Sequence, residues 1–332
     1  MDAILILTIL VVIFALGFDF INGFHDTANA IATSVSTRAL PPRVAVLLAA
    51  VMNFIGALTF TGVAKTITKD IVDPFALQNG SLIILAALLS AIAWNLITWY
   101  FGIPSSSSHA LIGSIAGAAV SAAGLGILNY TGFIKILQAL LISPFLALAV
   151  GFLMMSLFKI LFKNNNLYRT NKGFRIFQIG TAALQSFTHG TNDAQKAMGI
   201  ITMALIAAEM QSTDDIQMWV RVSAALAMGI GTSIGGYKII KTVGGKIMKI
   251  RPINGAAADL SSALIIFGAT TIHLPVSTTH VISSAIMGVG SAQRVKGVKW
   301  GVAKKIIITW VITLPICAAL AAIIYQVLHL FY

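Results

Sequence analysis

The sequence predicts an all-α integral membrane protein built from two repeats of opposite orientation. Its 332 residues are 58% hydrophobic and only 10% charged, with a mean hydropathy of +0.91, whereas a soluble domain is about half apolar and a quarter charged. Apolar runs close to the ~20 residues that cross a bilayer recur along the chain, as at residues 3–21, 44–64 and 306–328. A lipid bilayer is therefore the expected environment of the whole chain.

Two motifs each occur twice, in the same order, at a spacing of about half the chain. The first occupies residues 22–30 and 188–197, and its Gly and Asp recur 167 positions apart. The second is a proline followed by hydroxyl residues and a histidine, at residues 104–109 and 275–280, with proline and histidine both 171 positions apart. Internal self-similarity of this kind indicates a duplicated structural unit. We expect a first repeat over residues 1–165 and a second over residues 166–332.

Basic loops predict the orientation of the two halves, because Lys and Arg accumulate on the cytoplasmic side of a membrane. Three loops carry five basic residues each and no acid: Lys159, Lys163, Arg169, Lys172 and Arg175; Lys238, Lys241, Lys246, Lys249 and Arg251; Arg294, Lys296, Lys299, Lys304 and Lys305. Equivalent loops of the two halves differ in charge, so the halves are expected to be inverted. We expect a multi-pass protein of the inner (plasma) membrane with both termini outside. The net charge of +12 then reflects orientation and gives no reason to expect a nucleic-acid partner.

The first apolar segment predicts a long helix with a break. It follows Met1 without a basic region or a cleavage site, so we expect a retained spanning helix and not a signal peptide. Residues 3–37 would span about 52 Å as one straight helix, which exceeds the bilayer core. We expect a break near Asn22-Gly23 and, by the same argument, another at His189-Gly190.

Asp26 and Asp193 lie in apolar segments, where a charged side chain is costly unless it is paired, hydrated or neutralised. Each has amide side chains close by in the sequence, and hard cations bind such oxygen ligands. The expected cation ligands are Asn22, Asp26, Asn29, Asn192 and Asp193. In the alternative interpretation, the two carboxylates cap broken helices or pair with Lys196 and His25.

The two proline motifs predict half-helices that bind an anion at their N-termini. Proline disfavours helix in the residue before it, and a Ser or Thr caps the helix that follows. The free amides and hydroxyls at such a helix start attract an anion. In inverted halves the two hairpins enter from opposite sides, and their tips meet near the midplane. The expected anion-binding residues are Ser105, Ser106, Ser107, Ser108, Ser277, Thr278 and Thr279. Alternatively, these hydroxyls bond back to helix carbonyls at a proline kink.

Several ionisable residues are accessory candidates. His109 and His280 end the two proline motifs at equivalent positions, where they can bond the anion, relay a proton or serve a structural role. Lys196 can balance the charge of the anion or pair with an acid. Asp19 and Asp259 have no acidic counterpart in the other repeat, and they are expected to form local pairs or accessory ion sites.

Two other classes of function are weaker interpretations of the same residues. A serine beside His109 suggests an intramembrane hydrolase, but the motif is duplicated and no Gly-x-Ser-x-Gly elbow is present. We therefore do not expect an enzyme. A passive anion channel would also use half-helix tips, although buried acids beside an anion site fit coupled cation transport better.

The motifs resemble those of the inorganic phosphate transporter (PiT) family, and specifically of its bacterial and archaeal branch. The resemblance is carried by residues 23–30, 189–196 and 275–280, and it extends over nearly the whole chain. It implies an inverted-repeat symporter, commonly a homodimer, that imports inorganic phosphate with Na⁺ or, alternatively, with H⁺ or as a metal-phosphate complex. We assign phosphate to the two hydroxyl tips together with Gln195, and Na⁺ to the five cation ligands above. No cofactor other than the coupling cation is expected. The departures from the familiar Gly-Ala-Asn-Asp form, His25 and Gln195-Lys196, are those of the prokaryotic branch.

Overall fold

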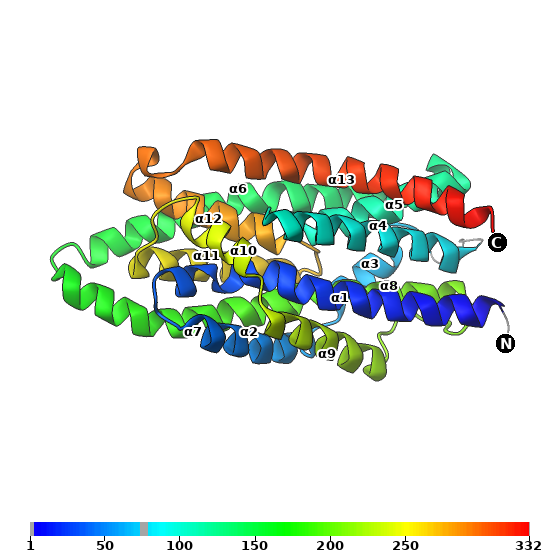
Figure 1. Ribbon diagram of the computed structural model, residues 1–332, viewed down its shortest axis with the longest axis horizontal. Coiled ribbons are helices and arrows are strands. Elements are labelled where there is room, and N and C mark those ends of the chain that lie inside the picture. Colours follow the sequence, from blue (N-terminus) through cyan, green and yellow to red (C-terminus); the bar gives the residue numbers. More distant parts are fainter. Residues whose placement is uncertain (1–2, 74–78, 332) are drawn as a thin grey trace.

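The computed structural model describes residues 3–73 and 79–331, which form a bundle of long helices (Figure 1). The first half contains α1 (Ala3–Ser36), α2 (Pro42–Ala57), α3 (Gly62–Lys69), α4 (Gly80–Phe101), α5 (Ser107–Ala123), the 3₁₀ turn η2 (Leu125–Ile127) and α6 (Tyr130–Leu161). The second contains α7 (Leu167–Asp193), α8 (Gln195–Ala207), α9 (Met218–Ile234), α10 (Tyr237–Gly245), α11 (Pro252–Thr271), α12 (Thr278–Gln293), η3 (Val295–Gly297) and α13 (Trp300–His329).

Five of the described helices, α1, α4, α6, α11 and α13, are long and apolar enough to cross a membrane. The pair α2 and α3, bent by 69°, is a sixth candidate span. Large apolar side chains on α6 and α13 are exposed, among them Phe145 and Val311, as expected of surfaces that face lipid. The predicted all-α membrane fold is therefore confirmed.

The order of elements in the first half recurs in the second, with α7 and α8 together in the place of α1. In Figure 1, α1 begins at the end of the bundle where both termini lie, whereas α7 begins at the opposite end. Helices of the two halves also exchange partners: α6 packs on α12 and α13 on α5, while α1 packs on α9 and α2 on α7. The two halves therefore share one interior.

The predicted break near Asn22-Gly23 is wrong, because α1 is continuous over its 34 residues. Gly23 has a packing role. A Cβ atom built on it would lie 2.5 Å from the carbonyl oxygen of Met228 in α9, so the absence of a side chain lets the two backbones approach closely. Gly23 is thus a point of contact between two helices and not the place of a break.

The predicted break at His189-Gly190 is also misplaced. Gly190 lies inside α7, and a Cβ on it would lie 2.3 Å from the carbonyl oxygen of Asn53 in α2. The observed discontinuity falls at Ala194, whose dihedral angles remain helical. Both motif glycines thus place α1 and α7 against a helix from the other half.

The two hairpins form as the proline motifs predict. Gly102, directly after α4, and His273, two residues after α11, both have a positive φ, and extended segments then lead to α5 and α12. Ser106 and Ser277 cap these helices by accepting hydrogen bonds from the backbone N–H groups of His109 and His280, at 3.1 and 3.2 Å. Side-chain capping of the two helix starts is confirmed.

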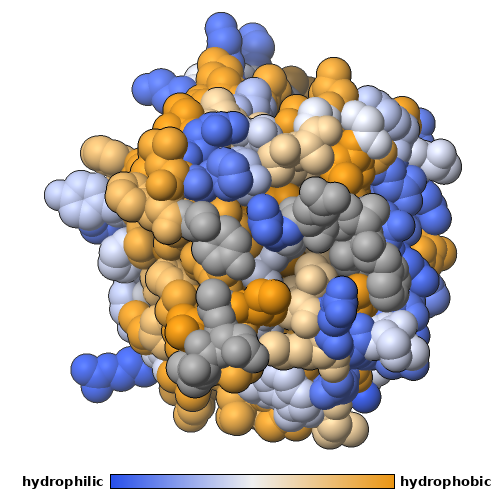
Figure 2. All heavy atoms as spheres, turned by 90° about the vertical axis from the view of Figure 1, so that its right-hand side faces the viewer, coloured by the Kyte–Doolittle hydropathy of each residue, from blue (hydrophilic) through white to orange (hydrophobic). Residues whose placement is uncertain are grey.

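The basic loops gather at one end of the bundle. Residues from all three basic loops, Lys159, Lys249 and Arg294 among them, line one open pocket of about 660 Å³. Figure 2 shows the other end, which carries the termini and exposes hydrophilic and hydrophobic residues side by side. There, lysines of α3 form ion pairs with the acidic loop before α9. Lys65 Nζ lies 2.6 Å from Asp215, and Lys69 Nζ lies 2.7 Å from Asp214. Because residues of all three basic loops line one pocket, these loops lie together, as expected of loops on one side of a membrane.

Candidate functional site

The tips of the two hairpins meet in the interior. The Ser108 hydroxyl donates to the carbonyl oxygen of Val276 at 2.8 Å, and the rings of His109 and His280 lie 4.4 Å apart. All the hydroxyl residues of both tips are buried. The expectation that the tips converge is therefore correct.

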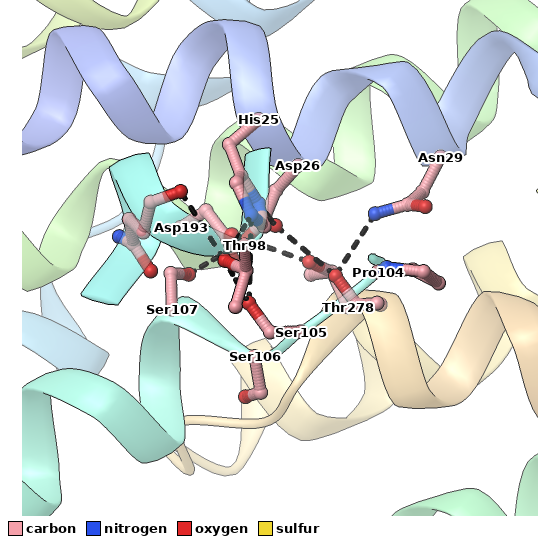
Figure 3. Close-up of polar contacts among 12 residues, drawn as sticks. His25, Asp26, Asn29, Thr98, Pro104, Ser105, Ser106, Ser107, Asp193 and Thr278 are labelled. Atoms are coloured by element: carbon pink, nitrogen blue, oxygen red, sulfur yellow. Dashed lines mark hydrogen bonds and ion pairs between the residues drawn. The ribbon is translucent and has the colours of Figure 1, made fainter. Parts of the chain in front are cut away.

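Asp26 of α1 lies between the two tips (Figure 3). Its Oδ2 accepts a 2.5 Å hydrogen bond from Ser107 at the start of α5, and its Oδ1 accepts a 3.1 Å bond from Thr279 at the start of α12. The Nδ1 atom of His25 lies 2.6 Å from the same Oδ1. The Asp26 carboxylate is thus hydrogen-bonded to the first turns of both α5 and α12 and connects the two tips.

Asp193, at the end of α7, has a comparable set of partners. Its Oδ2 lies 2.9 Å from Lys196 Nζ and accepts a 3.2 Å bond from Thr278. His189 Nε2 lies 3.4 Å away, close enough for an ion pair but without hydrogen-bond geometry. Each of the two predicted acids therefore contacts a histidine of its own motif and a hydroxyl of α12.

Lys196 connects the two acids. Besides its pair with Asp193, its Nζ donates to the Ser107 hydroxyl at 2.9 Å, and Ser107 in turn donates to Asp26. The buried ammonium thereby offsets negative charge that would otherwise be costly inside a membrane. These are the contacts expected under the alternative interpretation, in which the acids pair with Lys196 and His25.

Thr98 is a functional candidate that the sequence did not indicate, and His25, expected only as a partner of an acid, contacts it. His25 Nε2 lies 3.1 Å from the Thr98 hydroxyl of α4 and 3.4 Å from that of Ser105, and Thr98 and Ser105 are 2.8 Å apart. His25 is therefore fixed on both sides, by Asp26 and by the first tip. The position of His25 next to Asp26 in the sequence indicates that it belongs to the site. Thr98 lies outside every motif, so the sequence gives no such indication for it.

The predicted amide ligands have different positions. The Asn29 Nδ2 group donates to Thr279 at 2.9 Å, which keeps it within the site. Asn192 instead holds the second hairpin, donating to the Leu274 carbonyl and accepting from the Val276 N–H, both at 3.2 Å. Gln195 accepts from the N–H of Ala64 in α3 at 3.0 Å and donates to Thr191. Asn22 is buried, and its amide lacks a hydrogen-bond partner among the described residues.

The accessory histidines His109 and His280 lie beside α6 and α13. His109 Nδ1 is 2.8 Å from the Ser106 hydroxyl, and His280 stacks on Trp310 with ring centroids 4.0 Å apart. Both rings line a mainly apolar cavity of about 390 Å³ between α6 and α13. These contacts fix the two rings beside α6 and α13.

The arrangement combines two opposite electrostatic elements in one buried cluster. The starts of α5 and α12 present backbone N–H groups without intrahelical acceptors, together with hydroxyl donors, and these favour an anion. The two carboxylates favour a cation or a proton. Because the same hydroxyls contact both elements, binding of an anion at the tips and the charge state of the acids are physically linked.

Spanning helices around such a buried polar centre define a membrane transport protein. Residues 22–321 match the phosphate transporter family. The chain is 72% identical to the "Probable low-affinity inorganic phosphate transporter" of Bacillus subtilis over the full length of both chains. It is 43% identical to the protein of that name from Rhizobium meliloti, over 98% of each. A solved structure described as "The sodium-dependent phosphate transporter" superposes with a TM-score of 0.88 at 28% identity, over 98% of this chain and 100% of that one. The protein belongs to the phosphate transporter family, as the motif resemblance indicated.

Proposed function

We propose that this phosphate transporter imports inorganic phosphate in symport with a cation, Na⁺ in the first instance, by alternating access. The observation that supports this most directly is the position of Ser107. Its hydroxyl lies at the start of α5, where an anion would bind, and it bonds both Lys196 and Asp26. A phosphate that takes over the Ser107 hydroxyl would therefore alter the partners of the acid, and this couples anion binding to cation binding.

Phosphate is proposed to bind across the two tips. The hydroxyls of Ser105, Ser107, Thr278 and Thr279 face the acid cluster, and the first-turn N–H groups of α5 and α12 add donors for a tetrahedral anion. Ser106 and Ser277 act as helix caps that hold these amides in place. Gln195, the first residue of α8, is proposed to complete the phosphate site, and its amide bonds Ala64 of α3 and Thr191 of α7.

The coupling cation is proposed to bind at the acids and their amides, Asn22, Asp26, Asn29, Asn192 and Asp193. Carboxylate and amide oxygens suit Na⁺, a hard cation, and the superposable structure is described as sodium-dependent. The Lys196 ammonium favours a second candidate, H⁺ coupling, because it already supplies a positive charge at Asp193.

We further propose that residues 1–165 and 166–332 are inverted repeats whose tips meet near the midplane of the inner (plasma) membrane. The repeated order of elements, the opposite starting ends of α1 and α7, and the grouping of basic loops support this. With the basic loops inside, both termini lie outside. A homodimer, implied by the resemblance, completes the proposal.

The test is accumulation of radiolabelled phosphate in proteoliposomes. An inward Na⁺ gradient is imposed with the proton gradient collapsed, against a K⁺ gradient as control. Accumulation that requires Na⁺ would support Na⁺ symport, and accumulation only with a proton gradient would support H⁺ symport. Mere equilibration under both gradients would contradict the symporter and favour a passive channel.

A further inference from the structure

Asp19 is a buried carboxylate with no hydrogen-bond partner in the described part of the chain. It lies in α1, its side chain is 0% exposed, and neither Oδ1 nor Oδ2 has a donor. Asn22, one helical turn later on the same face of α1, is also 0% exposed, and both of its amide atoms lack partners. The Asn22 side chain is close enough to act on the Asp19 carboxylate, but neither group forms a hydrogen bond of good geometry with the rest of the described chain, as buried polar groups normally do.

The other acids of this region differ from Asp19 in this respect. Asp26 has Ser107, Thr279 and His25 as partners. Asp193 has Lys196 and Thr278 on its Oδ2. The acids that carry the motifs thus have charged or hydroxyl partners, whereas Asp19, which lies outside both motifs, has only the Asn22 amide close by.

The charges around Asp19 do not neutralise it by direct contact. Lys196 and Asp193 are the charged groups that act on it, and the Lys196 ammonium is already bonded to Asp193 and Ser107. Of the two helices with the most extensive contact with α1, α4 carries no Asp, Glu, Lys, Arg or His, and α9 carries only Arg221. Arg221 bonds the carbonyl oxygen of Leu58 near the start of α9. Asp259 of α11 accepts hydrogen bonds from Thr33, which lies farther along α1, and from Thr181 of α7.

We propose that Asp19, with Asn22 beside it, binds a coupling cation of this transporter, as a site additional to Asp26 and Asp193. The ligand is a monovalent cation carried on the Asp19 carboxylate, either a proton that converts it to the neutral acid or a Na⁺ ion that also contacts the Asn22 oxygen. An ionised carboxylate without partners is strongly disfavoured in this interior. The closed, buried arrangement is therefore stable only with the cation bound. This inference rests on the proposed symport.

The site gives a reason for coupling. When the cation leaves, the Asp19 charge returns, and the buried arrangement becomes unfavourable until water or another cation reaches the carboxylate. Lys196 connects the two sites. Its ammonium attracts the Asp19 carboxylate electrostatically and donates a hydrogen bond to the Ser107 hydroxyl of the first tip. Removing the charge of Asp19 should then free the transporter from the cation without disturbing the tips.

The experiment compares Asp19→Asn with the wild type in proteoliposomes. Two quantities are measured: exchange of labelled phosphate at equal concentrations on both sides, and accumulation driven by a Na⁺ gradient or by a pH gradient. We expect Asp19→Asn to retain exchange and to lose accumulation under both gradients. Asp214→Asn, the same substitution in the loop before α9, should retain both. The gradient that drives the wild type identifies the cation as Na⁺ or H⁺.

Accumulation by Asp19→Asn equal to that of the wild type would overturn the proposal. Loss of exchange together with accumulation would also overturn it, because Asp19 would then act in phosphate binding or folding. Thermal unfolding of the purified variant separates these two causes. A wild type that accumulates phosphate under neither gradient would instead refute the proposed symport itself, so the two failures are distinguishable.

Discussion

Lys196 Nζ lies 2.9 Å from Asp193 Oδ2, one helical turn away, with both side chains buried. Removing one partner of a buried ion pair leaves an uncompensated charge and costs about 3–5 kcal/mol. We expect Lys196→Met to lower the thermal unfolding temperature clearly and to abolish uptake. The double variant Asp193→Asn/Lys196→Met should recover part of the stability, because it removes both charges.

Lys172→Met, which changes an exposed lysine of the same half, is the matched control and should unfold like the wild type. A double variant whose destabilisation equals the sum of the two single effects would show that Lys196 and Asp193 do not interact energetically.

Asp26→Asn and Asp193→Asn test the proposed cation ligands. Asparagine keeps the size of the side chain but removes the charge, so each variant should lose more than about tenfold in coupled uptake, equivalent to about 1.4 kcal/mol. Asp26→Asn should also slow phosphate exchange, because its oxygens hold Ser107 and Thr279. Uptake at the wild-type rate in both variants would remove these residues from the mechanism.

Gly190→Ala and Gly180→Ala form a matched pair within α7. A Cβ on Gly190 would overlap the backbone of α2, whereas a Cβ on Gly180 meets nothing within 4 Å. We expect Gly190→Ala to destabilise the protein by about 1–3 kcal/mol, and Gly180→Ala to stabilise it by about 0.5–1 kcal/mol through helix propensity. Denaturation of both variants in the same detergent measures the difference. Equal effects would show that close packing of α7 on α2 is not needed.

The pair between Lys69 and Asp214 predicts a small pH dependence of stability. The hydrogen bond from Lys69 lowers the pKa of Asp214 below its ordinary value, so the folded state binds this proton less readily than the unfolded chain. The stabilisation is therefore complete above the unfolded pKa and is lost as the pH falls through the lowered pKa. Because both side chains are partly exposed, it amounts to less than about 1 kcal/mol. Unfolding of Asp214→Asn at pH 7 and at a pH below the lowered pKa of Asp214 should reveal a difference from the wild type only at pH 7.

Local chemistry explains which parts of the site could be predicted from the sequence. The caps Ser106 and Ser277 followed from proline and hydroxyl residues at fixed spacing, because capping depends on the next three residues only. The meeting of the tips followed from the duplication. Thr98 could not be predicted, since its contact with His25 depends on how α4 packs against α1 and leaves no trace in either segment.

The motif glycines mark special positions in α1 and α7, but their role differs from the predicted one. Gly23 and Gly190 recur at equivalent positions, and the length of each apolar segment predicted a break close to them. In the structure both are points where helices of different halves touch, and such contacts are also a reason for glycine in membrane helices. Sequence pattern alone does not separate these two roles.

The exchange of helix partners has a consequence for the order in which the protein can assemble. Helix α5 carries the first hydroxyl tip, yet it packs on α13 of the second half, and α6 likewise packs on α12. During synthesis, the first half therefore reaches the bilayer before these neighbours exist. The binding centre can become compact only after α13 has been synthesised. Truncation just before α13 should then leave a protein that inserts into the membrane but is cleared by membrane proteases.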